Sequence, residues 1–327
     1  MGCDHLRERG AGTLVAAAAG DALGAPFEGG LPPPGWADLA GGGPRDLEPG
    51  EWTDDTALTL AVAEVAATGI DLRRDEALDR IGDRFLDWYR AGAPGIGATT
   101  RRALSRARSG ADLRRAAVAL PRRASRSASN GALMRTAPVA LAHLGDDPAM
   151  AEAAVGVARL THPDELAAES CVIWCIAIDR AIREDRIDGA WDALEQLPIG
   201  ARRRWGRWLA ETRERPARSF RPNGHTVACL QAALAAALQT PGSRLAASLR
   251  AAVEIGDDTD TVACVAGALL GARWGRSEIP TRWRDRLHDR WGHTADDLER
   301  LAFAIVDRRS GCDGGGRGSR AEARTRV

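Results

Sequence analysis

The 327-residue chain contains no lysine, and all 45 of its basic residues are arginines. Because alanine and glycine are also abundant, we interpret this absence as the codon bias of a GC-rich genome. The chain also lacks a net charge, since 45 acidic residues balance the arginines. Dedicated nucleic-acid binders usually carry an excess of positive charge. We therefore expect no nucleic-acid partner.

Long apolar runs and targeting segments are missing as well. The longest apolar runs, residues 171–178 and 227–238, are far shorter than the ~20 residues of a membrane span. The polar start has no signal-peptide core, and leucine at position 6 breaks the myristoylation pattern. The six cysteines are scattered and predict no disulfide framework, and Cys171 and Cys175 are expected to be buried thiols. These absences predict a cytoplasmic protein without a membrane partner.

Strand-like alternation is hard to find, and apolar residues instead recur at the i, i+3, i+4 spacing of helices. A hydrophobic content of 44% excludes wholesale disorder. No repeat of 20–50 residues is evident, which argues against a helical solenoid. The pattern predicts one all-α domain over residues 1–309. Its most regular helices are expected at 56–67, 72–90, 150–160, 167–182, 226–238 and 262–274.

Two segments depart from the helical pattern. Residues 31–50 are rich in proline and glycine, which predicts a long surface loop. Residues 310–327 are rich in glycine and arginine without apolar periodicity, which predicts a disordered tail.

Three acidic motifs lie next to predicted helices: GDALGAPFE from Gly20 to Glu28, WTDDT ending at Thr56, and GDDTDT beginning at Gly256. They can be read as helix caps, yet a cap needs one side chain and these motifs offer several. If the motifs converge in the fold, carboxylates ~4 Å apart repel by ~4 kcal/mol at an effective dielectric of 20, and only cations or raised pKa values make that repulsion tolerable. Carboxylate and threonine oxygens suit Mg²⁺ or Mn²⁺ better than Zn²⁺. Spacing alone leaves caps and a metal site equally open.

The chain resembles the ADP-ribosylglycohydrolase family, of the dinitrogenase-reductase-activating glycohydrolase type, in five motifs. They follow one another in the order GDALGAPFE, EWTDDTALTLAVAE, SNGALMRTAPVAL, THPDELAAES and IGDDTDTVACVAGALLGARWG. The resemblance extends from about residue 12 to residue 275. It implies a compact multi-helix orthogonal bundle with two Mg²⁺ or Mn²⁺ ions. It also implies hydrolysis of the glycosidic bond that joins ADP-ribose to a protein side chain or small molecule.

The same resemblance implies roles for individual residues. It implies catalytic roles for Glu28, as the group that activates water, and for Asp55. Asp21 matches an acidic position to which we assign local support. The implied substrate contacts are Asn130, Gly131, Met134, Arg135 and His162. The implied metal ligands are Thr53, Asp54, Asp55, Asp258, Asp260 and Thr261.

Two further features carry weaker interpretations. His225 stands where relatives usually have an aromatic residue, and its imidazole can still stack on a base. Residues 101–126 hold nine arginines and one acid. This segment is typical of a solvated helix face, and the alternative is an electropositive rim that steers a pyrophosphate.

The expected partner is an ADP-ribosylated protein or an ADP-ribose-linked small molecule, and we expect a monomer. Two alternatives stay open. One is a non-catalytic relative that binds ADP-ribose, whose usual sign is the loss of metal ligands. The other is a metal-dependent nucleotide phosphohydrolase, which would release AMP or phosphate in place of ADP-ribose.

Overall fold

The computed structural model describes residues 2–119, 128–240 and 244–310, and these residues form helices joined by loops. Their β-structure is limited to isolated bridges, such as the one between Ser129 and His225. The prediction of an all-α fold is confirmed. None of the described helices has the length and apolar character that crossing a membrane requires. The tail predicted for 310–327 lies outside the described residues except for Ser310, the last residue of a helix.

The predicted helices are present with ends that differ by a few residues. The six most regular segments correspond to α2, α3, α7, α8, α10 and α12. The α-helices are α1 (Cys3–Gly24), α2 (Asp54–Ala66), α3 (Asp75–Arg90), α4 (Ala98–Leu104), α5 (Gly110–Ala119), α6 (Ala137–Ala142), α7 (Asp147–Arg159), α8 (Glu165–Glu184), α9 (Ile199–Glu214), α10 (Thr226–Gln239), α11 (Leu245–Val253), α12 (Thr259–Trp274), α13 (Thr281–Arg284) and α14 (Ala295–Ser310). Short 3-10 helices are η1 (Ala25–Phe27), η2 (Gly43–Arg45), η3 (Leu133–Arg135), η4 (Asp188–Gln196), η5 (Ala217–Ser219) and η6 (Arg276–Glu278).

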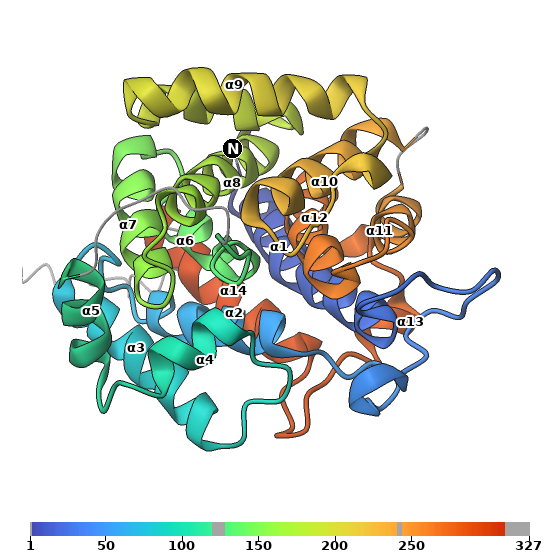
Figure 1. The fold of residues 1–327 in the computed structure, drawn as a ribbon, viewed down its shortest axis with the longest axis horizontal. Coiled ribbons are helices and arrows are strands. Elements are labelled where there is room, and N and C mark those ends of the chain that lie inside the picture. Colours follow the sequence, from blue (N-terminus) through green and yellow to red (C-terminus); the bar gives the residue numbers. More distant parts are fainter. Residues whose placement is uncertain (1, 120–127, 241–243, 311–327) are drawn as a thin grey trace, which may run out of the picture.

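Helices α1 and α12 run antiparallel in the middle of the molecule (Figure 1). Glycines at their contact let the two backbones approach closely. A Cβ atom added to Gly20 would lie 2.1 Å from the carbonyl oxygen of Ala263, and one added to Gly267 would lie 2.1 Å from that of Ala16. This contact brings the last turns of α1 beside the first turn of α12, where two of the acidic motifs lie.

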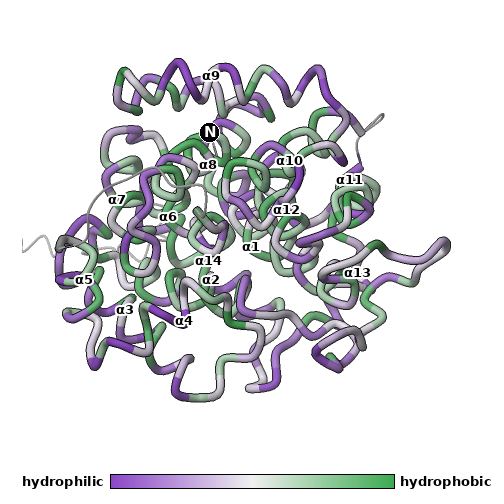
Figure 2. Tube along the Cα trace, viewed as in Figure 1, coloured by the Kyte–Doolittle hydropathy of each residue, from purple (hydrophilic) through white to green (hydrophobic). Residues whose placement is uncertain are grey.

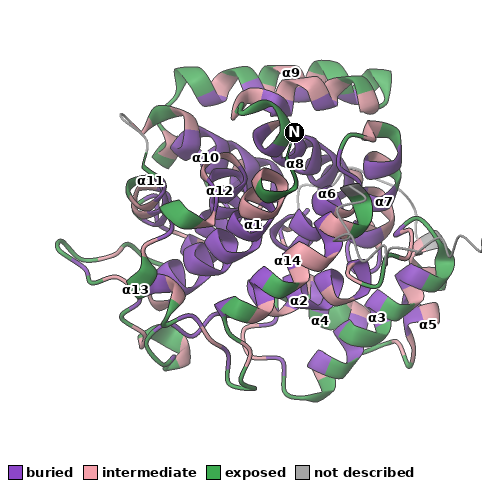
Figure 3. Ribbon diagram, turned by 180° about the vertical axis from the view of Figure 1, so that it is seen from behind, coloured by how far each residue is buried: buried purple, intermediate pink, exposed green. Residues whose placement is uncertain are grey.

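Next to this pair, α8 is buried along most of its length. Figure 3 shows α1, α8 and α12 as largely buried, and Figure 2 shows hydrophilic residues gathered along α9 and the outer loops. Cys171 and Cys175 on α8 are buried thiols, as predicted. Cys3 alone among the described cysteines is disulfide-bonded.

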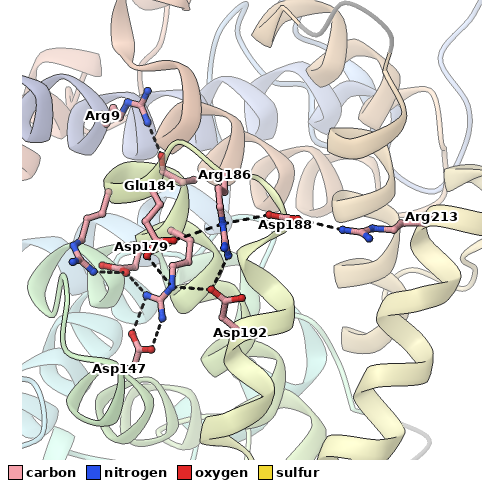
Figure 4. Close-up of polar contacts among 11 residues, drawn as sticks. Arg9, Asp147, Asp179, Glu184, Arg186, Asp188, Asp192 and Arg213 are labelled. Carbon is pink, nitrogen blue, oxygen red and sulfur yellow. Dashed lines mark hydrogen bonds and ion pairs between the residues drawn. The ribbon is translucent and has the colours of Figure 1, made fainter.

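A network of ion pairs joins the C-terminal end of α8 to its neighbours (Figure 4). Arg180 pairs with Asp147 of α7, with Asp192 of η4 at 3.0 Å, and with the buried Asp179 at 2.5 Å. Asp179 also accepts a hydrogen bond from the backbone of Gly145 at 2.8 Å. Because buried charges are stable only when paired and hydrogen-bonded, this network fixes α7, α8 and η4 relative to one another.

Candidate metal centre and active site

Asp21 fastens the start of α2 to α1. Its completely buried carboxylate accepts hydrogen bonds from the backbone N–H groups of Thr53 and Thr56, at 3.0 and 3.1 Å, and from their hydroxyls at 2.8 and 2.7 Å. Asp21 thereby satisfies first-turn donors that a local cap residue would otherwise satisfy. The cap residues of α2 and α12, Thr53 and Asp258, make no capping hydrogen bond with their own side chains.

Three carboxylates meet where α1, α2 and α12 come together. Asp21, Asp55 and Asp260 are all buried, and one carboxylate oxygen of each lies within 4.8 Å of the other two. We call these three residues the acidic cluster. The Oδ1 atom of Asp55 is buried without a hydrogen-bond partner among the described residues. A buried oxygen of this kind is costly unless a proton or a cation satisfies it.

Burial and mutual repulsion raise the pKa values of these carboxyl groups. Burial, and then the charge of Asp260, raises the pKa of Asp21 to about 6. Burial, reinforced by neighbouring aspartates, raises the pKa values of Asp55 and Asp258 well above their usual range. Burial also raises the pKa of Asp54, although the guanidinium of Arg45 opposes the shift. The site therefore favours protons or cations that reduce its negative charge.

The residues present fit a hard divalent cation. A pocket of about 160 Å³, which we call the inner pocket, is lined by five of the six predicted ligands: Asp54, Asp55, Asp258, Asp260 and Thr261. The sixth, Thr53, is buried and donates its hydroxyl to Asp21 at 2.8 Å. All six residues offer oxygen atoms as metal ligands, and one of these atoms is the unpaired Oδ1 of Asp55. Oxygen ligands of this kind suit Mg²⁺ or Mn²⁺.

The only two asparagines of the chain hold the turn before α12. Asn223 is completely buried, and its side chain accepts a hydrogen bond from the backbone of Asp258 at 2.8 Å and donates one to Gly256 at 3.0 Å. The amide of Asn130 donates to the carboxylate of Asp258 at 2.9 Å and to the backbone of Asn223 at 3.1 Å. Reasoning from the sequence singled out Asn130 and missed the positioning role of Asn223.

Of the five residues predicted to contact substrate, four line the inner pocket: Asn130, Gly131, Met134 and His162. The side chain of Arg135 lies beneath the pocket, fully buried and 4.6 Å from the ring centroid of Phe85. Burial lowers the pKa of Arg135 to about 10. Arg135 therefore supports the pocket wall and does not form part of its lining.

A chain of hydrogen bonds leads from Arg135 to the pocket through His162. Arg135 donates to the hydroxyl of Thr161 at 2.7 Å, and that hydroxyl is hydrogen-bonded to Nδ1 of His162 at 2.8 Å. The Nε2 atom of His162 is in turn hydrogen-bonded to the hydroxyl of Ser129 at 2.9 Å. Burial, assisted by the charge of Arg135, lowers the pKa of His162 to about 3. His162 is accordingly a neutral imidazole, and its hydrogen bond orients Ser129, which also lines the pocket.

The segment 31–50 is more than a surface loop, because it supplies one wall of the site. Its residues Trp36, Leu39 and Leu47 are buried. Arg45 extends into the inner pocket, where it forms an ion pair with Glu28 and donates to Asp260 at 3.0 Å. Nothing in the local sequence distinguishes Arg45 from the many exposed arginines, and its role was not predicted.

A larger hollow of about 560 Å³, the outer pocket, adjoins the inner one. The two share Glu28, Ser129 and Asp258, and the outer pocket extends to His225. Nδ1 of His225 accepts a hydrogen bond from the backbone of Val227 at 3.3 Å and so begins α10.

The arginine-rich segment 101–126 lies partly outside the described residues, which omit 120–127. In the described part, Arg114 pairs with Asp79 at 2.6 Å and Arg115 with Asp112 at 2.7 Å. Arg101 and Arg102 are exposed on α4, the helix whose first residues line the inner pocket. This arrangement agrees with a solvated face close to the site.

Comparisons with known proteins agree with these observations. The family model for ADP-ribosylglycohydrolase matches residues 3–314. The chain is 30% identical to ADP-ribosylarginine hydrolase Tri1 of Serratia proteamaculans (strain 568), over 90% of this chain and 80% of that protein. It is 28% identical to the Tri1 protein of Pseudomonas putida (strain GB-1), over 93% of this chain and 80% of that protein. A solved structure described as an ADP-ribosylglycohydrolase-related protein complex matches with a TM-score of 0.70 and 31% identity, over 94% of this chain and 99% of that one.

Proposed function

The chain belongs to the ADP-ribosylglycohydrolase family and is a glycosidic-bond hydrolase acting on ADP-ribosylated substrates, and on this premise we propose that it is a divalent-metal-dependent hydrolase of ADP-ribosylarginine. The observation that carries the metal dependence is the acidic cluster with the unpaired buried oxygen of Asp55. The arginine linkage is supported by the names of the two Tri1 relatives.

The residues proposed to hold two Mg²⁺ or Mn²⁺ ions are the six predicted from the sequence, and Asp21 lies beside two of them, Asp55 and Asp260. Bound divalent ions would supply a polarised water and anchor the hydroxyls of the distal ribose. The ligand list is Thr53, Asp54, Asp55, Asp258, Asp260 and Thr261.

The chain's own residues would then bind the substrate and accept the proton of the attacking water. Glu28, where the inner and outer pockets meet, accepts a proton from the attacking water. Asn130, Gly131, Met134 and His162 bind the distal ribose in the inner pocket, and His225 faces the adenosine half in the outer pocket. The bond to C1″ of this ribose breaks through an oxocarbenium-like transition state, as in other glycosidic cleavages.

The proposal is tested by the products released from an arginine-ADP-ribosylated peptide, with Mg²⁺ or Mn²⁺ and with EDTA. Mass spectrometry should find free ADP-ribose and the unmodified peptide in the presence of metal only. AMP as a product would instead identify a phosphohydrolase, and an unchanged peptide would identify a non-catalytic binder. A serine-ADP-ribosylated peptide in the same assay tests the linkage, since its hydrolysis at an equal rate would contradict arginine specificity.

Divalent metal is expected to raise the melting temperature of the protein. Metal at 100 times its dissociation constant, bound to the native state alone, stabilises by ~2.7 kcal/mol, which for a chain of this length corresponds to roughly 4 °C. Differential scanning fluorimetry with Mn²⁺, and then with excess EDTA, measures this shift and its reversal. Equal melting temperatures in Mn²⁺ and in EDTA would count against the metal centre.

A further inference from the structure

The positive charge that faces the acidic cluster comes from the chain itself. The guanidinium of Arg45 donates to Asp260 at 3.0 Å and forms an ion pair with Glu28. Only 17% of the Arg45 side chain is exposed. Although burial opposes it, the charges of Asp260, Glu28 and Asp54 raise the pKa of Arg45, so the guanidinium is charged.

The pocket wall opposite Arg45 has room for the guanidinium because it carries no side chain. A Cβ atom added to Gly95 would lie 3.1 Å from Cζ of Arg45 and 2.8 Å from Oδ1 of Asp54. Gly95 also has a φ of +83°, a conformation that other residues adopt rarely. Gly95 thus lies against the guanidinium of Arg45 and the carboxylate of Asp54, where a larger residue would not fit.

We propose that Arg45 and the divalent metal occupy this acidic site alternately, and that Arg45 thereby sets the affinity of the site for metal. The inference rests on the metal centre of the proposed function. Mg²⁺ lies ~2.1 Å from a ligand oxygen, so a metal on Asp260 and a guanidinium 3.0 Å from the same carboxylate would be neighbouring positive charges. Their repulsion makes joint occupancy unfavourable.

Arg45 can leave without rearrangement of the helices. It lies at the end of η2 in the loop 31–50, and its long side chain has several rotatable bonds. The backbone beside it is pinned by two hydrogen bonds between Gly42 and Leu47, at 2.7 and 3.1 Å. The movable part is therefore the side chain, which releases Asp260 and Glu28 together when it turns away.

The test compares the Mn²⁺ affinities of wild type and Arg45→Gln by isothermal titration calorimetry. If Arg45 fills the site in about nine of ten metal-free molecules, its removal tightens Mn²⁺ binding about tenfold. In EDTA, Arg45→Gln should melt at a lower temperature than wild type, because the carboxylates have lost their counter-charge. The rise in melting temperature on adding Mn²⁺ should be larger for Arg45→Gln than for wild type.

Two further variants make the result specific. Arg84→Gln also removes one positive charge, but from an exposed ion pair with Glu64. Because Glu64 lies ten residues after Asp54 on α2, this variant should leave Mn²⁺ affinity unchanged. Arg45→Lys keeps the charge but lacks the planar fork that engages two carboxylates, so it should tighten Mn²⁺ binding less than Arg45→Gln. If Arg45→Gln does not fold, Arg45→Lys tests the proposal in its place.

Equal or weaker Mn²⁺ binding by folded Arg45→Gln would overturn the proposal, since Arg45 would then stay beside the metal or support its ligands. Should Arg45→Gln not fold, Mn²⁺ binding by Arg45→Lys no tighter than that of wild type would overturn it in the same way. If neither the wild type nor any variant bound Mn²⁺, both this inference and the proposed metal centre would be contradicted. Mn²⁺ binding without release of ADP-ribose would instead contradict the proposed function and leave the competition between Arg45 and metal standing.

Discussion

Asp55→Asn is expected to slow the hydrolysis of an arginine-ADP-ribosylated peptide by about 10³-fold or more while the metal-free protein remains folded. Asp55 contributes a negative charge to the proposed metal site through an oxygen that has no other partner. Metal catalysis supplies several kcal/mol of charge stabilisation, and each ~1.4 kcal/mol corresponds to a factor of ten in rate. Loss of this ligand should also weaken Mn²⁺ binding measured by calorimetry.

The same substitution is expected to preserve or increase the stability of the metal-free protein at neutral pH. Burial and the neighbouring aspartates raise the pKa of Asp55 in the folded state, so the folded protein keeps this proton at pH values where the unfolded chain has released it. The free energy of unfolding therefore falls as the pH rises from the ordinary aspartate pKa of ~3.9 through the raised folded-state pKa. Asparagine does not titrate, so thermal unfolding of Asp55→Asn in EDTA should depend less on pH.

Asp257→Asn is the matched control for this prediction. Asp257 belongs to the third acidic motif, but its carboxylate accepts a backbone hydrogen bond from Asn223 at 2.9 Å, which the oxygen of asparagine can also accept. Its φ of +70° is one that asparagine tolerates well. Asp257→Asn should therefore retain Mn²⁺ affinity. Unchanged Mn²⁺ affinity and activity in Asp55→Asn would refute its assignment as a ligand, and an unfolded Asp55→Asn in EDTA would assign it to the fold alone.

The helices and the acidic motifs could be predicted because each depends on residues that are close together in the sequence. Apolar residues at helical spacing locate α2 and α12, and the motifs that end at Thr56 and begin at Gly256 stand directly before or at their first turns. Spacing could not decide between caps and ligands. In the structure Asp21, on another helix, accepts hydrogen bonds from the N–H groups of Thr53 and Thr56 at the start of α2, so Asp54 and Asp55 are not needed as caps and line the pocket.

The residues that were missed act across long separations in the chain. Arg45 meets Asp260, which is 215 residues away, only because the Gly/Pro-rich loop folds back over the pocket. Asn223 positions Asp258 from 35 residues away. Arg135 illustrates the opposite difficulty, since its motif identifies the wall of the pocket but cannot tell that the side chain points into the core. Such roles follow from tertiary packing, which local periodicity does not encode.

Glu28→Gln is expected to lose about 10²–10⁴-fold in kcat while it binds ADP-ribose within a few-fold of wild type. Glu28 follows η1, lines both pockets, and has a side chain that is 35% exposed, so a water molecule can reach it. A group that only accepts a proton in the transition state contributes to kcat and not to ground-state binding. Glutamine has the same shape and, in the metal-free protein, can still accept a hydrogen bond from Arg45, which separates loss of the base from loss of structure.

Proton transfer to Glu28 also predicts a pH dependence. Burial, followed by the charge of Asp260, raises the pKa of Glu28 above the usual glutamate value, and Arg45 opposes this shift. Activity of the wild type should therefore rise with pH as Glu28 loses its proton, and the residual activity of Glu28→Gln should lack this acidic limb. Glu48→Gln, an exposed carboxylate of the loop 31–50, is the matched control and should keep both kcat and the acidic limb. If Glu28→Gln instead turned over normally, the base would have to be sought among Asp54, Asp55 and Asp257, and the pairing of Glu28 with Arg45 would serve only to hold the guanidinium in place.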